Sequence, residues 1–452
     1  MFFLKDGNRL NLFFLILFIV IVCPSFIYSS HNANRYFPFL EKPEDYVTRR
    51  KKTYLTPSLF LTTASSAFRK GGGSCGIPEL WGNYDLKDII FALKQVDPFY
   101  IDPTFLERGT QDWVGKSIKF KVNGKVTSRG LTLGYKQNLG FLGLSLGGFI
   151  PLAHVKSTAR FNFDAEHSDI NSGNLKPGER YQVDRIRAKV HEDLGLKGSE
   201  WSKTGFGDLD LFLQFNHNWD HELLIRNIDF NLRFGVLCPT GMEMEIDYPT
   251  SVPFMDNGNW GIYFDMVTDL ELKQDLRVGV MLGFIDLLKE TQNRRISVYK
   301  EPVIFSPLKA DTQVNPGWTF KVSPYLEFSN LRDGLNIQGR YTYLKHGADK
   351  WKDMRSEKTV KSYLDQTVDS LRDLNEYPGY VDDQKIKENK YDKKYISRNT
   401  SSYLTLEVTY DSKEAFNNWW LEPAFYFIYD YPAGGGGVAK THQVTLGVEL
   451  HF

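Results

Sequence analysis

Long hydrophobic runs are scarce in this sequence. Beyond residue 22, no apolar stretch approaches the roughly 18 residues that a membrane-spanning helix requires, which excludes a bundle of transmembrane helices. Basic and acidic residues balance at 55 each, so no overall charge draws the chain toward nucleic acid. The glycine runs at residues 71–73 and 434–437 are not followed by Lys-Ser or Lys-Thr, which argues against a phosphate-binding loop. We expect no cofactor and no nucleic-acid partner.

Aromatic residues, in contrast, are abundant. They make up 15% of the chain, with 24 Tyr and 33 Phe, although the mean hydropathy is −0.36. A protein that crosses a membrane with β-strands shows this combination, because each strand is only half apolar and aromatic girdles mark both membrane interfaces.

Twelve segments have the length and composition of β-strands. They lie near residues 53–66, 127–139, 141–154, 205–218, 226–238, 259–272, 274–288, 316–330, 333–346, 401–412, 417–430 and 440–452. The connections between them alternate strictly, long after the first strand and short after the second. Transmembrane barrels have this asymmetry, with short periplasmic turns and longer extracellular loops. The sequence therefore predicts an all-β fold, a transmembrane antiparallel up-and-down β-barrel of about 12 strands with long, partly helical extracellular loops.

Both ends of the chain indicate export to an outer membrane. Lys5 and Arg9 precede the apolar run of residues 12–22, as in a signal peptide. The last strand alternates and stops on Phe452, and it resembles the closing strand of Gram-negative outer-membrane β-barrels, whose assembly machinery recognises such a terminus. We predict a signal peptide at 1–30, a periplasmic segment at 31–52 and the barrel at 53–452. The expected location is the cell outer membrane.

The alternation also predicts which side chains face the barrel interior. Acidic residues outnumber basic ones in this inward row. Its predicted lumen-lining charges are Asp208, Asp210, Asp229, Arg233, Asp265, Asp269, Glu271, Arg277, Lys321, Glu327, Arg340, Glu407, Glu422 and Glu449. They indicate either an aqueous, mildly cation-favouring lumen or side chains that pair to fill a narrow interior.

One stretch carries a recognisable motif. Gly205-Phe-Gly-Asp-Leu209 opens one strand, and Pro239-Thr-Gly241 ends the next. This pattern resembles outer-membrane proteins grouped with the meta-pathway phenol-degradation transporters, a set similar to FadL-type channels. The resemblance implies a barrel that passes small organic compounds. The glycines are suited to a tight strand entry near one rim, with Pro239–Gly241 expected at the opposite, outer rim.

The long loops contain amphipathic segments and two cysteines. Residues 85–95, 181–194 and 358–374 have helical periodicity, and we expect one of these helices either to fold into the lumen or to form a surface canopy. Cys75 and Cys238 both lie on the extracellular side of the predicted topology, either as a disulfide or as two free thiols.

These features together favour a channel or facilitated transporter that passes small solutes through a polar lumen. The alternative is a structural or surface-binding barrel with a blocked lumen, and an outer-membrane hydrolase is less favoured. No catalytic residues and no metal ligands are predicted. The expected partners are outer-membrane lipid, the barrel assembly machinery and small-molecule solutes, with the oligomeric state left open.

Overall fold

The computed structural model describes residues 34–37, 53–97, 99–106, 110–141, 143–170, 177–220, 225–273, 275–332, 334–354, 398–412 and 422–451. The predicted signal peptide, the helix expected at 358–374 and Phe452 lie outside these residues. Among the described residues, no helix is long and apolar enough to span a membrane.

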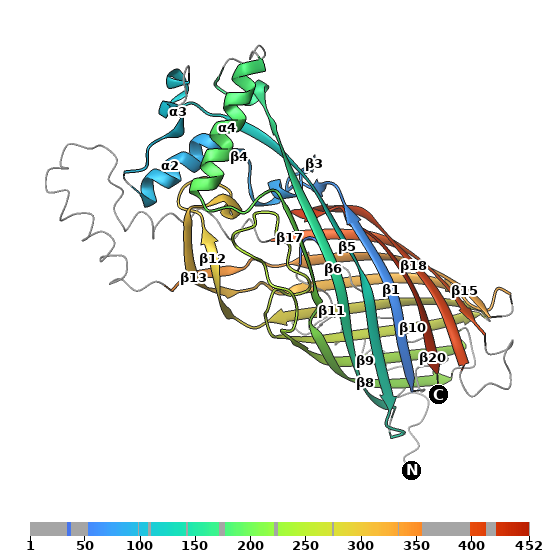
Figure 1. Cartoon of the computed structure of the whole chain (residues 1–452). Coiled ribbons are helices and arrows are strands. Elements are labelled where there is room, and N and C mark those ends of the chain that lie inside the picture. The colour runs from blue at the N-terminus through green and yellow to red at the C-terminus, as the bar shows by residue number, and fades with distance from the viewer. Residues whose placement is uncertain are drawn as a thin grey trace.

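Twelve antiparallel strands close into a barrel (Figure 1). Every strand pairs with the next one along the chain, and β1 pairs with both β5 and β20, which closes the circle. The strands are β1 (Tyr54–Ala64), β5 (Lys119–Asn138), β6 (Leu144–Phe163), β8 (Leu209–Asp220), β9 (Asn227–Cys238), β10 (Gly261–Lys273), β11 (Leu276–Leu287), β14 (Thr319–Phe328), β15 (Leu335–His346), β17 (Asn399–Asp411), β18 (Glu422–Gly436) and β20 (His442–His451). The predicted fold class and strand number are confirmed.

The closing strand β1 is the one with the poorest alternation in sequence, and its ladder shows why. Leu55 pairs with Leu450 and Ser58 with Gly447, but the two residues between them, Thr56 and Pro57, have no partner in β20. Proline lacks the backbone N–H that a ladder hydrogen bond needs. Pairing resumes on both sides of Pro57, so the barrel stays closed.

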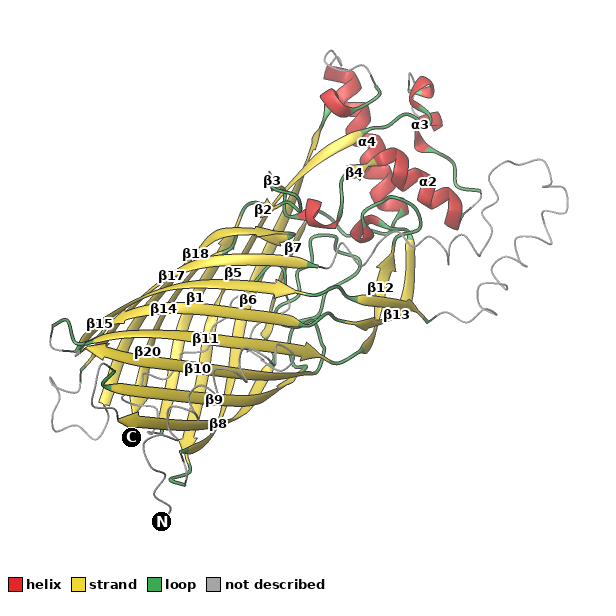
Figure 2. Ribbon diagram, turned by 180° about the vertical axis from the view of Figure 1, so that it is seen from behind, coloured by secondary structure: helices red, strands yellow, loops and turns green. Residues whose placement is uncertain are grey.

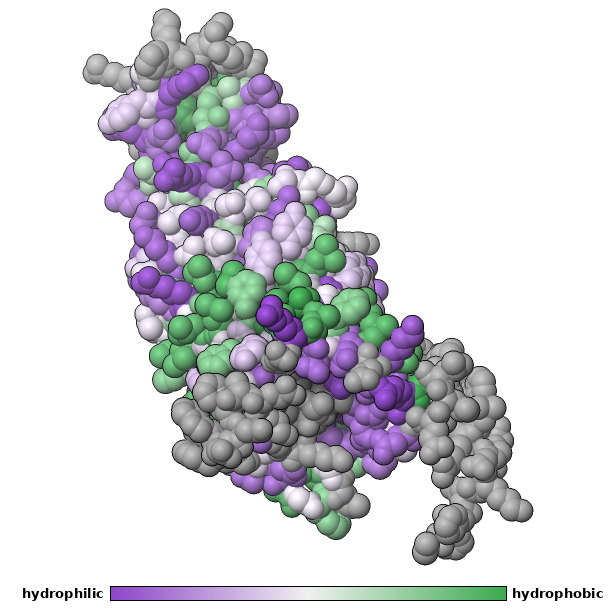
Figure 3. Space-filling view, turned by 90° about the vertical axis from the view of Figure 1, so that its right-hand side faces the viewer, coloured by the Kyte–Doolittle hydropathy of each residue, from purple (hydrophilic) through white to green (hydrophobic). Residues whose placement is uncertain are grey.

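The outer wall of the barrel carries an apolar belt. Leucine, phenylalanine and tyrosine side chains with large exposed fractions point outward from neighbouring strands, among them Leu59, Leu61, Leu131, Leu133, Leu213, Phe234, Leu404, Leu406, Phe425, Phe427 and Leu446. Figure 3 shows hydrophobic atoms gathered across the barrel wall, whereas the lobe beyond its end is mostly hydrophilic. Such a belt on a closed barrel is the surface that contacts lipid in an outer membrane.

A helical lobe lies beyond the long-loop end of the barrel, here called the outer end (Figures 1 and 2). The long strands β5 and β6 extend past the apolar belt and pack against α2 (Leu86–Val96) and α4 (Pro177–Asp193). Asp85 begins α2 by accepting a hydrogen bond from the backbone N–H of Lys87, as N-cap residues do. The short elements α3 (Pro103–Leu106), η3 (Gln111–Trp113), η4 (Ala165–His167) and β4 (Tyr84–Asp85) complete this lobe.

Small sheets complete the outer end. The strands β12 (Glu290–Ile296), β13 (Leu308–Asn315) and β16 (Lys350–Asp353) form one of them, visible beside the helices in Figure 2. The strands β2 (Ala67–Phe68), β3 (Ser74–Cys75) and β19 (Val438–Ala439) form another, and β7 (Glu200–Phe206) extends the β8 edge along β6. Two 3-10 turns lie in the connections: η2 (Pro78–Trp81) between β3 and β4, and η5 (Val303–Phe305) between β12 and β13.

Two of the predicted loop helices are confirmed, but neither enters the barrel. Ile89 and Ile90 of α2 and Ile186 of α4 are buried in one hydrophobic cluster with Phe120 and Val122 of β5. The buried apolar stripes of these helices pack against the extended β5–β6 hairpin, beyond the end of the apolar belt. Of the two alternatives, these two helices therefore fit the surface canopy, and the third expected helix, at 358–374, lies outside the described residues.

Candidate functional site

Thirteen of the fourteen predicted lumen charges occupy the inward row of a strand, alternating with lipid-facing residues, whereas Asp208 lies just before β8. Ten of them are buried: Asp208, Asp210, Asp229, Arg233, Asp269, Lys321, Glu327, Arg340, Glu407 and Glu449. Asp265, Glu271, Arg277 and Glu422 are intermediate in exposure. The structure therefore gathers side chains from nine strands on one interior wall. Their role in lining a solute path stays a prediction.

Several interior charges are held by polar neighbours on the same wall. Arg233 donates to the Oε1 atom of Gln214 through Nε and Nη2, at 3.2 and 3.0 Å, and its guanidinium lies 4.4 Å from the ring centroid of Phe212. Asp229 accepts hydrogen bonds from the side-chain amides of Asn218 and Asn227, at 2.9 and 3.2 Å. Charges inside a membrane barrel need such partners or water, because an isolated buried charge is costly.

A second feature of the inner wall was not predicted from the sequence: aromatic rings lie over glycines of the adjacent strand. Five glycines stand directly opposite an inward aromatic residue in the strand register, in the pairs Phe60 and Gly130, Phe212 and Gly147, Tyr263 and Gly235, Tyr325 and Gly279, and Tyr426 and Gly447. A Cβ atom added at Gly235 would lie 2.2 Å from the Tyr263 ring. The glycines let the rings lie against the wall instead of crossing the interior.

The segment between β9 and β10, residues 239–260, packs against inward-facing residues at the outer end of the barrel, and we call it the mouth loop. Phe254 of this loop is only 1% exposed and stacks on Phe60 of β1, with ring centroids 6.1 Å apart and planes inclined by 6°. Phe37, from the N-terminal segment, contacts the same Phe254 ring edge-on at 5.9 Å. These rings belong to a buried cluster that includes the inward residues Val126 of β5 and Val155 of β6. An apolar cluster therefore joins the mouth loop to the inner face of β1, β5 and β6 at the outer end of the barrel.

The recognised motif is what holds the mouth loop in place. The two carboxylate oxygens of Asp208 accept hydrogen bonds from the backbone N–H groups of Gly241 and Asp256, each at 2.8 Å. The hydroxyl of Thr240 donates to the carbonyl of Gly207 at 2.8 Å and accepts from the N–H of Leu209 at 2.9 Å. The loop is thus fastened to the start of β8 near both of its ends.

This arrangement corrects one expectation. Gly205, Gly207 and Pro239–Gly241 lie at the same outer rim, not at opposite rims. The reason is topological, since β8 and β9 form an antiparallel hairpin whose turn is at the other end of the barrel. Glycine is needed at position 207 because a Cβ atom there would lie 2.5 Å from Cγ of Pro151.

The N-terminal segment requires a second correction. Residues 31–52 were expected on the periplasmic side, but the described residues 34–37 lie at the outer end. The Asn34 side-chain amide donates to the carbonyl of Pro253 at 2.6 Å, and Thr441 donates to the carbonyl of Tyr36 at 2.6 Å. These contacts could not be predicted from the sequence, because the partner residues lie more than 200 positions away in the chain.

Cys75 and Cys238 are both free thiols in the structure, so they do not form the disulfide considered above. Cys75 belongs to the small sheet at the mouth and packs against the buried cluster there. Cys238 is the last residue of β9, one position after the inward-facing Leu237. Burial raises the pKa of the Cys75 thiol, which keeps it in its unreactive protonated form near neutral pH.

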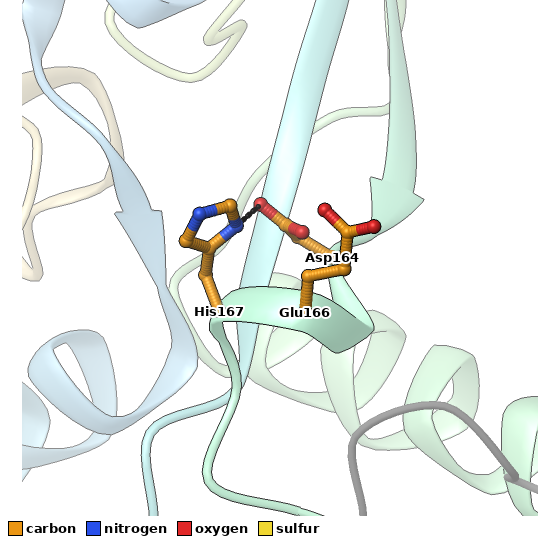
Figure 4. Close-up of side chains that lie close together, drawn as sticks. All are labelled: Asp164, Glu166 and His167. Atoms are coloured by element: carbon orange, nitrogen blue, oxygen red, sulfur yellow. Dashed lines mark hydrogen bonds and ion pairs between the residues drawn. The ribbon is translucent and has the colours of Figure 1, made fainter.

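A cluster of possible metal ligands, Asp164, Glu166 and His167, lies at the foot of the helical lobe (Figure 4). Asp164 accepts a hydrogen bond from Nδ1 of His167 at 2.9 Å and lies 3.4 Å from Nζ of Lys121. These two contacts outweigh the effect of desolvation and lower the pKa of Asp164. Its negative charge is therefore already compensated, and the exposed cluster has the character of a surface ion pair.

Comparisons with known proteins reach only the level of architecture. No protein-family model matches the chain, and no curated protein matches it either. An outer-membrane channel from Pseudomonas putida F1 is similar over 91% of this chain and 100% of its own, with 9% identity and a TM-score of 0.46. A Pseudomonas aeruginosa FadL homologue covers 89% of this chain and 90% of its own (9% identity, TM-score 0.28). The monoaromatic hydrocarbon channel CymD covers 90% and 89% (8% identity, TM-score 0.28).

These scores are too low to transfer a solute or a mechanism. The architecture rests on the chain's own strands, which close without an edge, and on the apolar belt around them. By these two properties the protein is a twelve-stranded outer-membrane β-barrel.

Proposed function

We propose that this barrel is a channel or facilitated transporter for small solutes, and that the described conformation is its closed state. One observation carries the proposal. Among the described residues, the inner wall bears charged side chains from most of its strands, with acids in excess, and the largest apolar cluster that touches this wall lies at its outer end. A barrel built only as a scaffold would gain more from an apolar filling, since buried charges oppose folding unless paired or hydrated.

Passage of a solute then requires the mouth loop to move. Its attachment points lie near its two ends: Thr240 and the Asp208 contact with Gly241 hold its beginning, and the Asp208 contact with Asp256 and the Gln292 contact with the carbonyl of Asn257, at 2.6 Å, hold its end. Between these points, Phe254 contributes the ring that fills the mouth. Loops that close barrels or active sites commonly move on the microsecond to millisecond scale.

The acid excess in the interior favours cations. Asp269, Glu327 and Glu407 are buried in the inward rows of β10, β14 and β17. Rings of acidic side chains give pores a preference for cations and for polar solutes with positive groups.

The test is to reconstitute the protein in a planar bilayer and record single-channel currents under a salt gradient. The proposal expects intermittent openings with a reversal potential on the cation side, and replacement of Asp269 and Glu327 by their amides is expected to reduce that selectivity. Arg340→Gln is the control of opposite sign: it removes a positive charge from the interior and is expected to increase cation preference. Anion selectivity that is unaffected by any of these changes would contradict the proposal.

The closed mouth also favours a second candidate, a surface-binding barrel with a permanently blocked lumen. The apolar cluster over the lumen is the observation in its favour. Conductance measurements on variants whose mouth-loop contacts are weakened distinguish the two candidates. A channel gains conductance when the loop is loosened, whereas a blocked barrel stays silent as long as it remains folded.

A further inference from the structure

A cavity of about 380 Å³ lies outside the lumen, between the mouth loop and the small sheet of β12, β13 and β16. Its wall combines aromatic rings with planar polar side chains, including Trp81, Tyr248, Trp351, Asn257 and Arg294. The volume lies in the range of small-molecule binding sites. None of the predicted lumen charges lines this cavity.

Arg294 lines the cavity, and only two of its three guanidinium nitrogens donate to the described residues. Its Nε and Nη2 atoms both donate to Oε1 of Gln292, at 3.0 and 2.6 Å, and the carboxylates of Asp349 and Glu243 act on it as nearby charges. The guanidinium lies 5.1 Å from the ring centroid of Trp351. Its partly desolvated position lowers the pKa of Arg294 to about 10, which still leaves it protonated at neutral pH. The Nη1 atom can therefore donate a hydrogen bond to an oxygen atom of a ligand.

Trp351 supplies a second donor. Its indole Nε1 atom is buried and has no hydrogen-bond acceptor among the described residues. Buried tryptophan N–H groups usually have a partner, because leaving one unsatisfied is destabilising. Two donors next to one cavity point to a ligand with oxygen atoms.

The opposite aromatic wall is held rigidly. Trp81 donates from Nε1 to the hydroxyl of Tyr36 at 2.6 Å, and the guanidinium of Arg35 lies 4.3 Å from its ring centroid. The floor is fixed by a reciprocal pair: Asn257 donates to Oε1 of Gln292 at 3.0 Å while Gln292 donates back to the carbonyl of Asn257 at 2.6 Å. A site whose walls are fixed before binding loses less entropy when a ligand enters.

The charges around the cavity balance, which disfavours a ligand with a strong charge of either sign. Lys197, Arg294 and Arg295 face Glu243, Glu245 and Asp247 in the lining. Asp247 is bound by Lys309 at 2.6 Å and Lys197 at 3.3 Å, and these contacts lower its pKa. Arg295 donates to the three backbone carbonyls of Ile246, Ser306 and Leu194, so it is a structural residue.

We propose that this cavity is a carbohydrate-binding site for a neutral mono- or disaccharide at the outer end of the barrel. Hydroxyl groups both donate and accept, so one polyol matches the guanidinium of Arg294, the indole N–H of Trp351 and the carboxylate of Glu243. The apolar face of a sugar ring fits against the indole rings. The proposal does not depend on conduction through the lumen. Because residues 243–249 and Asn257 of the mouth loop form one side of the site, an occupied cavity holds the loop in its closed position.

The test is isothermal titration calorimetry with maltose and glucose on the purified protein in lauryldimethylamine oxide, a detergent that carries no sugar headgroup. Wild type is expected to show saturable binding of at least one of the two sugars. Arg294→Gln is expected to weaken it about tenfold or more, and Trp351→Phe, which keeps a ring but removes the N–H, about threefold to tenfold. Trp318→Phe is the matched control, because Trp318 is an exposed tryptophan that does not line the cavity.

Heat-modifiable migration on gels shows whether each variant retains its barrel. The proposal is overturned if neither sugar binds saturably at high millimolar concentration, or if folded Arg294→Gln and Trp351→Phe bind the sugar as well as wild type does. It is also overturned if benzoate saturates the site while the sugars do not, since that result assigns the cavity to anions. Because binding is measured without a membrane, these outcomes are independent of whether the barrel conducts.

Discussion

Replacing Phe254 by alanine is expected to open the barrel mouth. Phe254 is 1% exposed, and its ring lies between Phe60 and Phe37. Truncating a buried phenylalanine to alanine typically costs about 3–5 kcal/mol, through lost transfer energy and the cavity left behind. The substitution therefore destabilises the closed conformation, in which the Phe254 ring packs against Phe60 and Phe37.

The effect on gating follows from this magnitude. If most of the lost contact energy is absent from the open conformation, a change of about 3 kcal/mol shifts the ratio of open to closed molecules by about a hundredfold. The assay is single-channel recording in a planar bilayer, with open probability as the readout. Phe254→Ala is expected to raise the open probability strongly while the conductance of each opening stays unchanged.

Phe305→Ala provides the matched control. Phe305 is also 1% exposed, but it lies in the core of the helical lobe, where its ring centroid is 4.9 Å from that of Tyr84. The same substitution should destabilise the lobe without changing the open probability to the same degree. Equal open probabilities for wild type and both variants, all shown to be folded, would refute the role of Phe254 as the closing residue.

Three further predictions follow from the described contacts. Gly235→Ala is expected to destabilise the barrel by about 1–3 kcal/mol, because its Cβ would overlap the Tyr263 ring, whereas Gly339→Ala, where the space is open, should be neutral; urea unfolding measures both. Asp208→Ala should make the mouth loop more sensitive to added protease, because two backbone N–H groups lose their acceptor; unchanged cleavage would contradict the locking role. Acidification should loosen the helical lobe through His191. Burial, with a smaller contribution from Arg187, lowers the pKa of His191 to about 3 in the folded state, so stability is present above the ordinary value of 6.5 and is lost as the pH falls from there toward 3. The loss amounts to at most about 5 kcal/mol below pH 3 and to about 3 kcal/mol at pH 4, and near-UV circular dichroism at pH 7 and pH 4 should show it in wild type but not in His191→Phe.

The barrel itself could be predicted from the sequence because the alternation that reveals a strand lies within a few consecutive residues. In strand β9, Ile228, Phe230 and Leu232 alternate with Asp229, Asn231 and Arg233, and this period of two assigns each side chain to lipid or interior without knowledge of the partner strands. The alternation of long and short connections then determined the strand count. The placement of Asp229, Arg233 and similar charges on the inner wall follows from the same period.

The content of the barrel mouth was not predictable in this way. Phe254 meets Phe60, which is almost 200 positions earlier, and Asn34 meets Pro253 across a separation of 219 residues. Nothing in the local pattern of residues 239–260 distinguishes a loop that folds inward from one that projects outward. The motif around Asp208 was visible in the sequence, but its function as a lock depends on the N–H groups of Gly241 and Asp256, which only the folded loop brings to it.

The sequence by itself determined a closed barrel, its strands and its lipid-facing belt, because these follow from the two-residue period of a strand and from the need to pair every backbone group in lipid. Only the tertiary structure decided what occupies the mouth, where the loop helices pack and which side chains of β12 and β16 meet around the outer cavity. These are contacts between segments far apart in the chain, and their partners are selected by packing in three dimensions rather than by any periodic pattern.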